Sequence, residues 1–191
     1  MAMVYSTKDM AKALKELIGE GVDFVIVGDT IVQLEMGKKS LKGDVDLFII
    51  NPSPFVEEDF YRALAEKHGW YFSYTDLGTP RLIAHVDGKD IELELYENIH
   101  DFYIPIEIIN EARKIKLHGI DVKLLHVEDY VLLKARAGSP DDIEKLSKVL
   151  GELKKEGIKL NTRILRQHLR YFPDEDRRVI VNRISSLGVK L

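Results

Sequence analysis

The segment from Gly43 to Pro52 (GDVDLFIINP) constrains the fold most, because it joins an acidic pair to an apolar strand. Asp44 to Ile50 has the composition of a buried strand, and Asn51-Pro52 is a typical end for one. Side chains two positions apart on a strand point to the same face, so Asp44 and Asp46 are expected side by side. The opposite face, toward the core, then carries Val45, Leu47 and Ile49.

Two carboxylates at that spacing repel each other by about 1 to 4 kcal/mol, depending on the local dielectric. A fold tolerates such a pair most readily where a cation lies between the two groups. Ligands that are all oxygen suit Mg²⁺ or Mn²⁺, and Mg²⁺ usually takes substrate phosphates as further ligands. The alternative is that this acidic pair is the solvated face of a half-exposed strand. The residues alone leave both interpretations open.

A second acidic pair lies on the expected strand from Asp90 to Tyr96, where Glu92 and Glu94 share a face. Three carboxylates on neighbouring strands could hold two metal ions. One ion would activate an attacking hydroxyl, and the other would hold a leaving pyrophosphate. Here too the alternative is a solvated strand face.

The 191 residues correspond to one domain, or to one domain with a small appendage. Apolar periodicity and turn residues predict an α/β domain over residues 1–125 and a helical subdomain, packed against it, over residues 126–191. Lys38 to Gly43 is expected to be a polar, basic loop. Strands are expected at 23–27, 44–50, 70–74, 82–86, 90–96, 113–117 and 120–125. Helices are expected at 10–18, 30–36, 53–68, 127–137, 141–156, 162–171 and 174–186.

Composition excludes several classes of function. The chain has no cysteine, so a disulfide framework, a thiol nucleophile and a cysteine zinc site are excluded. It has no apolar run long enough to span a membrane, and we expect a cytoplasmic protein. The net charge of −4 argues against a uniformly basic nucleic-acid coat. Abundant Lys and Glu with few Met are typical of a protein from a hot environment.

Common nucleotide and metal motifs are also missing. The chain has no Walker A motif and no dinucleotide fingerprint, and the six histidines show no metal-binding spacing.

Five segments, taken in order, resemble the nucleotidyltransferase superfamily with its polymerase β-like fold. The resemblance is strongest to the minimal branch related to the AbiEii abortive-infection toxins, and it covers about residues 20 to 150. In chain order, the segments are residues 24–30, 38–48, 94–102, 119–129 and 133–143. Residues 24–30 form a strand with a glycine turn, and residues 38–48 lead into the acidic strand. Residues 94–102 carry the third carboxylate, residues 119–129 lead into a helix, and residues 133–143 carry the last motif.

The resemblance implies a mixed sheet with flanking helices, followed by a helical subdomain. It implies transfer of a nucleoside monophosphate from an NTP to a hydroxyl of RNA, protein or a small molecule, with release of pyrophosphate. The residues at the family's catalytic positions are Asp44, Asp46, Glu94 and Lys134. Those at its nucleotide-binding positions are Gly28, Asp29, Thr30, Lys134 and Asp142. The implied ligands of Mg²⁺ or Mn²⁺ are Asp44, Asp46 and Glu94, with Glu92 as the alternative to Glu94.

Individual roles follow from the same resemblance. Gly28 would let the backbone approach the triphosphate, and Thr30 would donate to a phosphate oxygen. Glu94 would take the proton of the acceptor hydroxyl, and Lys134 would supply positive charge, supported by Asp142. Three of these residues also have an alternative role without any catalytic function. Thr30 could simply begin a helix, and Lys134 could be a solvated lysine on a helix surface. Asp142 could be an acidic residue that the helix dipole favours in a first helical turn. The lysines of the 38–43 loop would meet a nucleic acid or nucleotide, or are simply solvated.

The chain departs from the family pattern at three places. Asp29 replaces a glycine or serine, and a carboxylate beside a triphosphate is repulsive unless it turns away as a helix cap. Glu94 replaces an aspartate. Ser139, Asp141 and Lys145 alter the charges of the last motif. The alternative functions are therefore a catalytically degenerate binding module, such as a toxin–antitoxin component with an antitoxin partner, and a purely structural protein.

Overall fold

The computed structural model describes residues 3–99 and 102–191, which form two compact units. The first unit comprises the described residues within Met1–Tyr103 together with Arg113–Leu124, and the second is Ile104–Ala112 with Leu125–Leu191. His100 and Asp101, which belong to the third matched segment, lie outside the described residues. None of the helices in these ranges combines the length and the apolar character that crossing a membrane requires.

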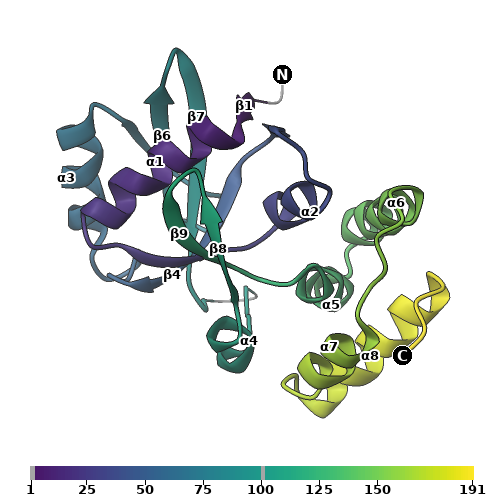
Figure 1. The fold of residues 1–191 in the computed structure, drawn as a ribbon. Coiled ribbons are helices and arrows are strands. Elements are labelled where there is room, and N and C mark those ends of the chain that lie inside the picture. The colour runs from purple at the N-terminus through teal and green to yellow at the C-terminus, as the bar shows by residue number, and fades with distance from the viewer. Residues whose placement is uncertain (1–2, 100–101) are drawn as a thin grey trace. The chain divides into compact units, whose positions relative to one another are not determined.

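A mixed sheet forms the centre of the first unit (Figure 1). Its strands lie in the order β5-β6-β7-β4-β2-β9-β8, with β4 parallel to β7, β2 parallel to β9 and the other neighbours antiparallel. Their bounds are β2 Asp23–Ile26, β4 Val45–Asn51, β5 Tyr71–Tyr74, β6 Pro80–Val86, β7 Lys89–Tyr96, β8 Arg113–Leu117 and β9 Ile120–Leu124. The helices of this unit are α1 Thr7–Gly19, α2 Asp29–Glu35 and α3 Glu58–His68.

The alternation of β4 separates the face that packs into the main apolar cluster from the face that carries Asp46. Val45, Leu47 and Ile49 belong to the main apolar cluster, as predicted. The buried side chains Met10, Leu14 and Leu17 bring α1 into the same cluster. The register of β4 therefore places Asp46 on the face opposite this apolar cluster.

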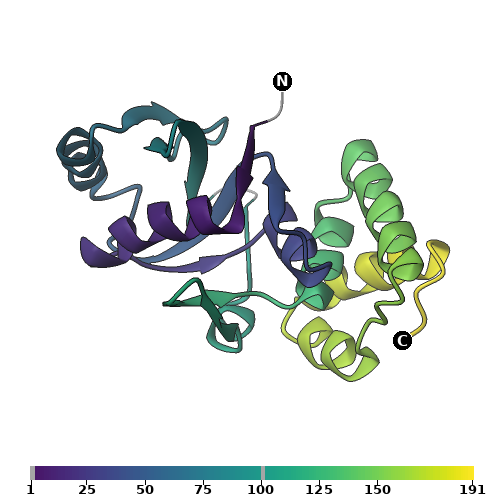
Figure 2. The same cartoon turned by 45° about the horizontal axis from the view of Figure 1, so that its top comes forward.

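Helices alone make up the second unit (Figure 2). They are α4 Ile106–Asn110, α5 Val127–Ala137, α6 Pro140–Lys155, α7 Thr162–Leu169 and α8 Asp174–Ser186. The helix α5 contacts α6, α7 and α8. Gly138 ends α5 in the left-handed conformation, and Ser139 caps α6, which begins with Pro140.

Two sequence predictions of local structure are wrong, and one helix was not predicted. The helix expected from residue 53 begins at Glu58, because the Ser53 hydroxyl and the Phe55 N–H donate to the Glu97 carboxylate instead. The expected basic loop contains a short strand, β3 Ser40–Lys42, which pairs with β1 Val4–Ser6. For the segment that forms α4, the sequence analysis made no prediction. Strands of three residues and a helix of five depend on tertiary contacts more than on local pattern.

Candidate active site

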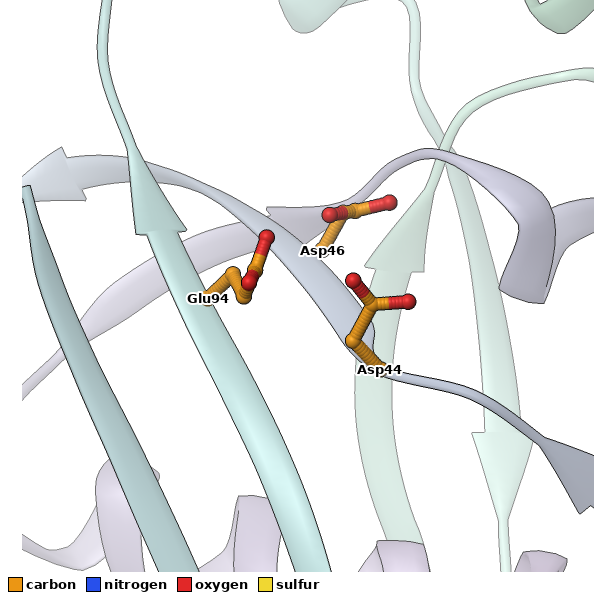
Figure 3. Close-up of side chains that lie close together, drawn as sticks. All are labelled: Asp44, Asp46 and Glu94. Atoms are coloured by element: carbon orange, nitrogen blue, oxygen red, sulfur yellow. The ribbon is translucent and has the colours of Figure 1, made fainter. Parts of the chain in front are cut away.

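Three carboxylates converge on one face of the sheet in the first unit (Figure 3). Asp44, Asp46 and Glu94 each offer one carboxylate oxygen, and these oxygens all lie within 4.8 Å of one another. Glu94 is only 7% exposed, whereas the two aspartates reach solvent. Within residues 3–99 and 102–191, no other set of three His, Asp or Glu side chains gathers in this way. The cluster therefore offers a shared site for a cation.

The strand register explains why these three residues meet. Asp46 on β4 is paired with Glu94 on the parallel neighbour β7. Asp44 lies just before β4, two positions from Asp46. Glu92 shares the face of Glu94 but is not part of the converging group.

Gly28 borders the cluster where β2 gives way to α2. Its φ of 68° lies in the left-handed region, which side chains disfavour. A Cβ built on Gly28 would lie 1.8 Å from Oδ2 of Asp46. The backbone N–H of Val27 also donates to the carbonyl of Asp46 at 2.9 Å. The glycine turn and the acidic strand are therefore fitted directly to each other.

Two buried hydroxyl groups lie next to the aspartates. The Thr30 hydroxyl donates to the carbonyl oxygen of Asp44 at 3.3 Å, and the residue is fully buried. Burial, and then the charge of Asp44, raise the pKa of the Tyr5 phenol, so this group stays protonated. In this structure Thr30 supports the backbone that presents Asp44.

Arg81 and Tyr96 hold the carboxylate of Glu94. The Arg81 Nε donates to Glu94 Oε1 at 2.9 Å, and Nη2 donates to the same oxygen. The Tyr96 hydroxyl donates to Oε2. Arg81 Nε also lies 2.7 Å from Oε1 of Glu92, so one guanidinium contacts two carboxylates. Burial, and then the hydrogen bond with Glu94, raise the pKa of Tyr96, which keeps it a donor.

Sequence reasoning missed Arg81, although a signal for it exists. The Asp87-Gly88 turn predicts a two-residue hairpin, and this turn sets the cross-strand pairs of β6 and β7. Counting outward from the turn pairs Val86 with Lys89 and Arg81 with Glu94. The register of a tight hairpin therefore identifies a cationic partner for the third acid.

The donor set fits a divalent ion that prefers oxygen. The cluster supplies three carboxylates, which are the ligands that Mg²⁺ and Mn²⁺ prefer. The single guanidinium of Arg81 balances only part of the negative charge of Asp44, Asp46, Glu92 and Glu94. A cation among these groups would relieve the remaining repulsion.

The second unit carries the remaining cationic candidate, Lys134. Its Nζ lies 3.0 Å from Asp142 Oδ1, and the Lys134 side chain is 26% exposed. Partial burial alone would raise the pKa of Asp142, but hydrogen bonds from Ser139 and Lys134 outweigh it and hold this pKa below its usual value. Asp142 therefore completes the capping box of α6 with Ser139 and fixes the Lys134 ammonium.

The other predicted residues lie near the start of α2 and in β3. Asp29 is the first residue of α2, whose N-cap is Gly28, so Asp29 is not the cap. Lys42 ends β3, and its backbone carbonyl accepts a hydrogen bond from the Gln33 side chain. Lys38 and Lys39 precede the strand.

Residues 6–186 match the model of a family described as "Nucleotidyl transferase of unknown function (DUF2204)". Comparison with the curated proteins gives no match. An antigenic nucleotidyltransferase-like protein from Paracoccidioides brasiliensis has a similar fold, with a TM-score of 0.59 at 15% identity. The match covers 100% of this chain and 96% of that one.

Two weaker structural likenesses are to an antibiotic-resistance factor and to an antibiotic adenylyltransferase. The antibiotic-resistance factor ANT(2'')-Ia matches with a TM-score of 0.48 at 15% identity, over 95% of this chain and 94% of that one. The lincosamide antibiotic adenylyltransferase LnuA, in its lincomycin-bound form, matches with a TM-score of 0.49 at 10% identity. That match covers 74% of this chain and 94% of the other.

Proposed function

Because the chain belongs to this family of nucleotidyl transferases of unknown function, we propose that it moves a nucleoside monophosphate from an NTP to a hydroxyl acceptor. The observation that carries the proposal is the convergence of Asp44, Asp46 and Glu94 within 4.8 Å. A glycine turn borders this cluster, and it leaves room for the carboxylate of Asp46.

In the proposed reaction the acceptor oxygen forms a bond to the α-phosphorus of the NTP. The bond from that phosphorus to the bridging oxygen of the β-phosphate breaks, and pyrophosphate leaves with the electron pair. The proton of the acceptor hydroxyl passes to solvent water, because the hydrogen bonds from Arg81 and Tyr96 leave Glu94 a single open direction, which a cation would take. Asp44, Asp46 and Glu94 together would hold Mg²⁺ or Mn²⁺. Such an ion would neutralise phosphate charge and acidify the hydroxyl.

The remaining residues have supporting roles in this proposal. Gly28 keeps the turn clear for Asp46 and for a nucleotide phosphate, and Thr30 fixes the backbone at Asp44. For Lys134 we retain the phosphate-binding role that the family resemblance implies, with Asp142 orienting its ammonium. RNA, a protein side chain and a small molecule remain the acceptor classes to test.

The second candidate function is that of a non-catalytic member that binds a nucleotide or a partner protein such as an antitoxin. One observation favours it. Ser139 and Asp142 form a capping box at the start of α6, so the altered motif has a structural use that needs no catalysis. Asp29 also differs from the family pattern, and its negative charge at the start of α2 would repel a triphosphate, which likewise favours a non-catalytic role.

A labelling experiment separates these functions. The protein is incubated with each α-³²P-labelled NTP, Mg²⁺ or Mn²⁺, and total RNA, and the label on RNA and on the protein itself is measured. Asp44→Asn and Asp46→Asn are expected to lose transfer by at least about 100-fold with unchanged melting temperatures. The control is Asp90→Asn, an exposed acid on β7 that pairs with His85. Transfer that survives in both cluster variants would refute the proposal, and NTP binding without transfer in the wild type would favour the binding module.

A further inference from the structure

The carboxylate of Glu94 is held by two neighbours whose arrangement determines which of its oxygens is available. Arg81 directs two N–H groups, from Nε and Nη2, to the single oxygen Oε1. The Tyr96 hydroxyl donates to the other oxygen, Oε2. Both partners come from neighbouring positions: Arg81 is the cross-strand partner of Glu94, and Tyr96 lies two residues along the same strand.

A carboxylate oxygen has about two lone-pair directions for hydrogen bonds or metal ions. The two bonds from Arg81 use both directions of Oε1. Oε2 accepts one hydrogen bond, from the Tyr96 hydroxyl, so its second lone-pair direction is used by neither Tyr96 nor Arg81. The arrangement therefore favours Oε2 as the oxygen that faces a cation.

Further contacts hold both donors in place. Arg81 also forms an ion pair with Glu92 at 2.7 Å, so its guanidinium is fixed between two acids. The Tyr96 ring stacks on Phe102, with ring centroids 4.7 Å apart and an interplanar angle of 20°. Glu94 itself is almost fully buried. A carboxylate with these neighbours has few alternative rotamers, whereas a lone glutamate on an exposed strand has many.

We propose that Arg81 and Tyr96 are positioning residues that orient Glu94 and leave one of its oxygens for the divalent ion. This inference rests on the proposed function, because it requires that the cluster binds a cation. Hydrogen-bond partners of metal ligands typically contribute about 10- to 100-fold in metal affinity. The positive charge of Arg81 repels a cation, so its removal would by itself strengthen cation binding. A test must therefore keep the charge and remove only the paired hydrogen bonds from Nε and Nη2 to Glu94.

The chain contains a matched control on its surface. Glu58 accepts from Arg62 Nε at 2.8 Å and from the Tyr74 hydroxyl at 2.7 Å. This is the same pairing of an arginine and a tyrosine on one carboxylate. It lies outside the converging acids. Substitutions at Arg62 and Tyr74 therefore show how the loss of such hydrogen bonds affects the protein when the carboxylate is not part of the cation site.

The experiment measures the binding of Mn²⁺ alone by the loss of its free EPR signal. Tyr96→Phe and Arg81→Lys are expected to raise the Mn²⁺ dissociation constant by about 10-fold or more. Arg62→Lys and Tyr74→Phe are expected to leave it within about twofold of the wild type. Tyr96→Phe keeps the ring that stacks on Phe102, so its melting temperature is expected to stay close to that of the wild type.

The outcomes separate this inference from the proposed function. If Asp44→Asn abolishes Mn²⁺ binding but Tyr96→Phe and Arg81→Lys bind as tightly as the wild type, the positioning role is overturned and the cation site stands. If the wild type binds no Mn²⁺, or Asp44→Asn binds it unchanged, the cation site fails and this inference fails with it. A weaker affinity in the surface controls as well would show a general effect on folding and would also overturn the positioning role.

Discussion

Gly28 and Asp46 are fitted to each other so closely that a methyl group on Gly28 would overlap Oδ2 of Asp46 at 1.8 Å. The two residues come from different elements, the turn after β2 and the strand β4. The absence of a side chain at one position is what allows the carboxylate at the other to reach the cluster. Local conformation at Gly28 and the geometry of the acidic cluster are therefore coupled.

The first prediction concerns Gly28→Ala. The added Cβ is expected to displace the Asp46 carboxylate and lower nucleotidyl transfer by about 100-fold, since a shift of about 1 Å in a site can cost that much. Alanine in the backbone conformation of Gly28 (φ 68°, ψ −156°), a region essentially confined to glycine, adds about 1 to 3 kcal/mol of destabilisation. The measurement is NTP turnover together with thermal unfolding.

The control for this prediction is Gly21→Ala. Gly21 also has a positive φ, of 85°, but a Cβ there would meet nothing within 4 Å. It should therefore show the destabilisation without the loss of transfer. Equal losses in both variants would mean that strain, and not the contact with Asp46, is responsible.

The second prediction separates Glu94 from Glu92. Glu94→Gln is expected to reduce transfer by about 100-fold or more, because an uncharged amide is a weaker cation ligand than a carboxylate. Glu92→Gln, on the same strand face, is expected to stay within about tenfold, because Glu92 pairs with Arg81 outside the converging group. The measurement is kcat/KM for the NTP. A larger loss in Glu92→Gln would transfer the role of third acid to Glu92.

The third prediction concerns Lys134. Lys134→Met is expected to lower kcat/KM for the NTP by about 100-fold, if its ammonium binds a phosphate in the transition state. The control is Lys148→Met, which removes an exposed lysine that pairs with Glu144 on α6. A steady-state assay over a range of NTP concentrations makes the measurement. Wild-type kinetics in Lys134→Met would leave this residue as a structural partner of Asp142.

The fourth prediction is a pH dependence of the stability of the second unit. His168 is 2% exposed and lies between two carboxylates, with Nδ1 bonded to Asp129 and Nε2 lying 3.0 Å from Glu111. Burial alone would lower the pKa of His168, but the bonds and charges of Asp129 and then Glu111 outweigh it, and this pKa is raised. The imidazolium therefore stabilises the fold fully at pH values below the unfolded pKa of about 6.5, and this stability is lost as the pH rises through the folded pKa.

Thermal unfolding between pH 5 and pH 9 tests this prediction. The wild type is expected to lose melting temperature across the alkaline side of that range, and His168→Gln is expected to show a flatter profile. His85→Gln is the control, because His85 is exposed and its bond to Asp90 lies at the surface. A profile for His168→Gln as steep as that of the wild type would contradict the prediction.

Much of the first unit follows from local pattern in the sequence. The alternation of β4 predicts that Val45, Leu47 and Ile49 lie in the core and that Asp46 lies on the other face, and the structure confirms it. The tight turn at Asp87-Gly88 fixes the register between β6 and β7, and this register places Arg81 opposite Glu94. Periodicity and tight turns act over a few residues, so one sequence is enough to predict their consequences.

The tertiary structure decided how separate segments meet. The parallel pairing of β4 with β7 places Asp46 beside Glu94, and no local pattern specifies which strands become neighbours. The same holds for the contact between Gly28 and Asp46 and for the hydroxyl of Thr30 on the Asp44 carbonyl. The sequence by itself determined which side chains share a strand face, because that depends on a backbone repeat of two residues. The meeting of acids from two strands depends on sheet order and packing across the whole unit, which only the folded chain specifies.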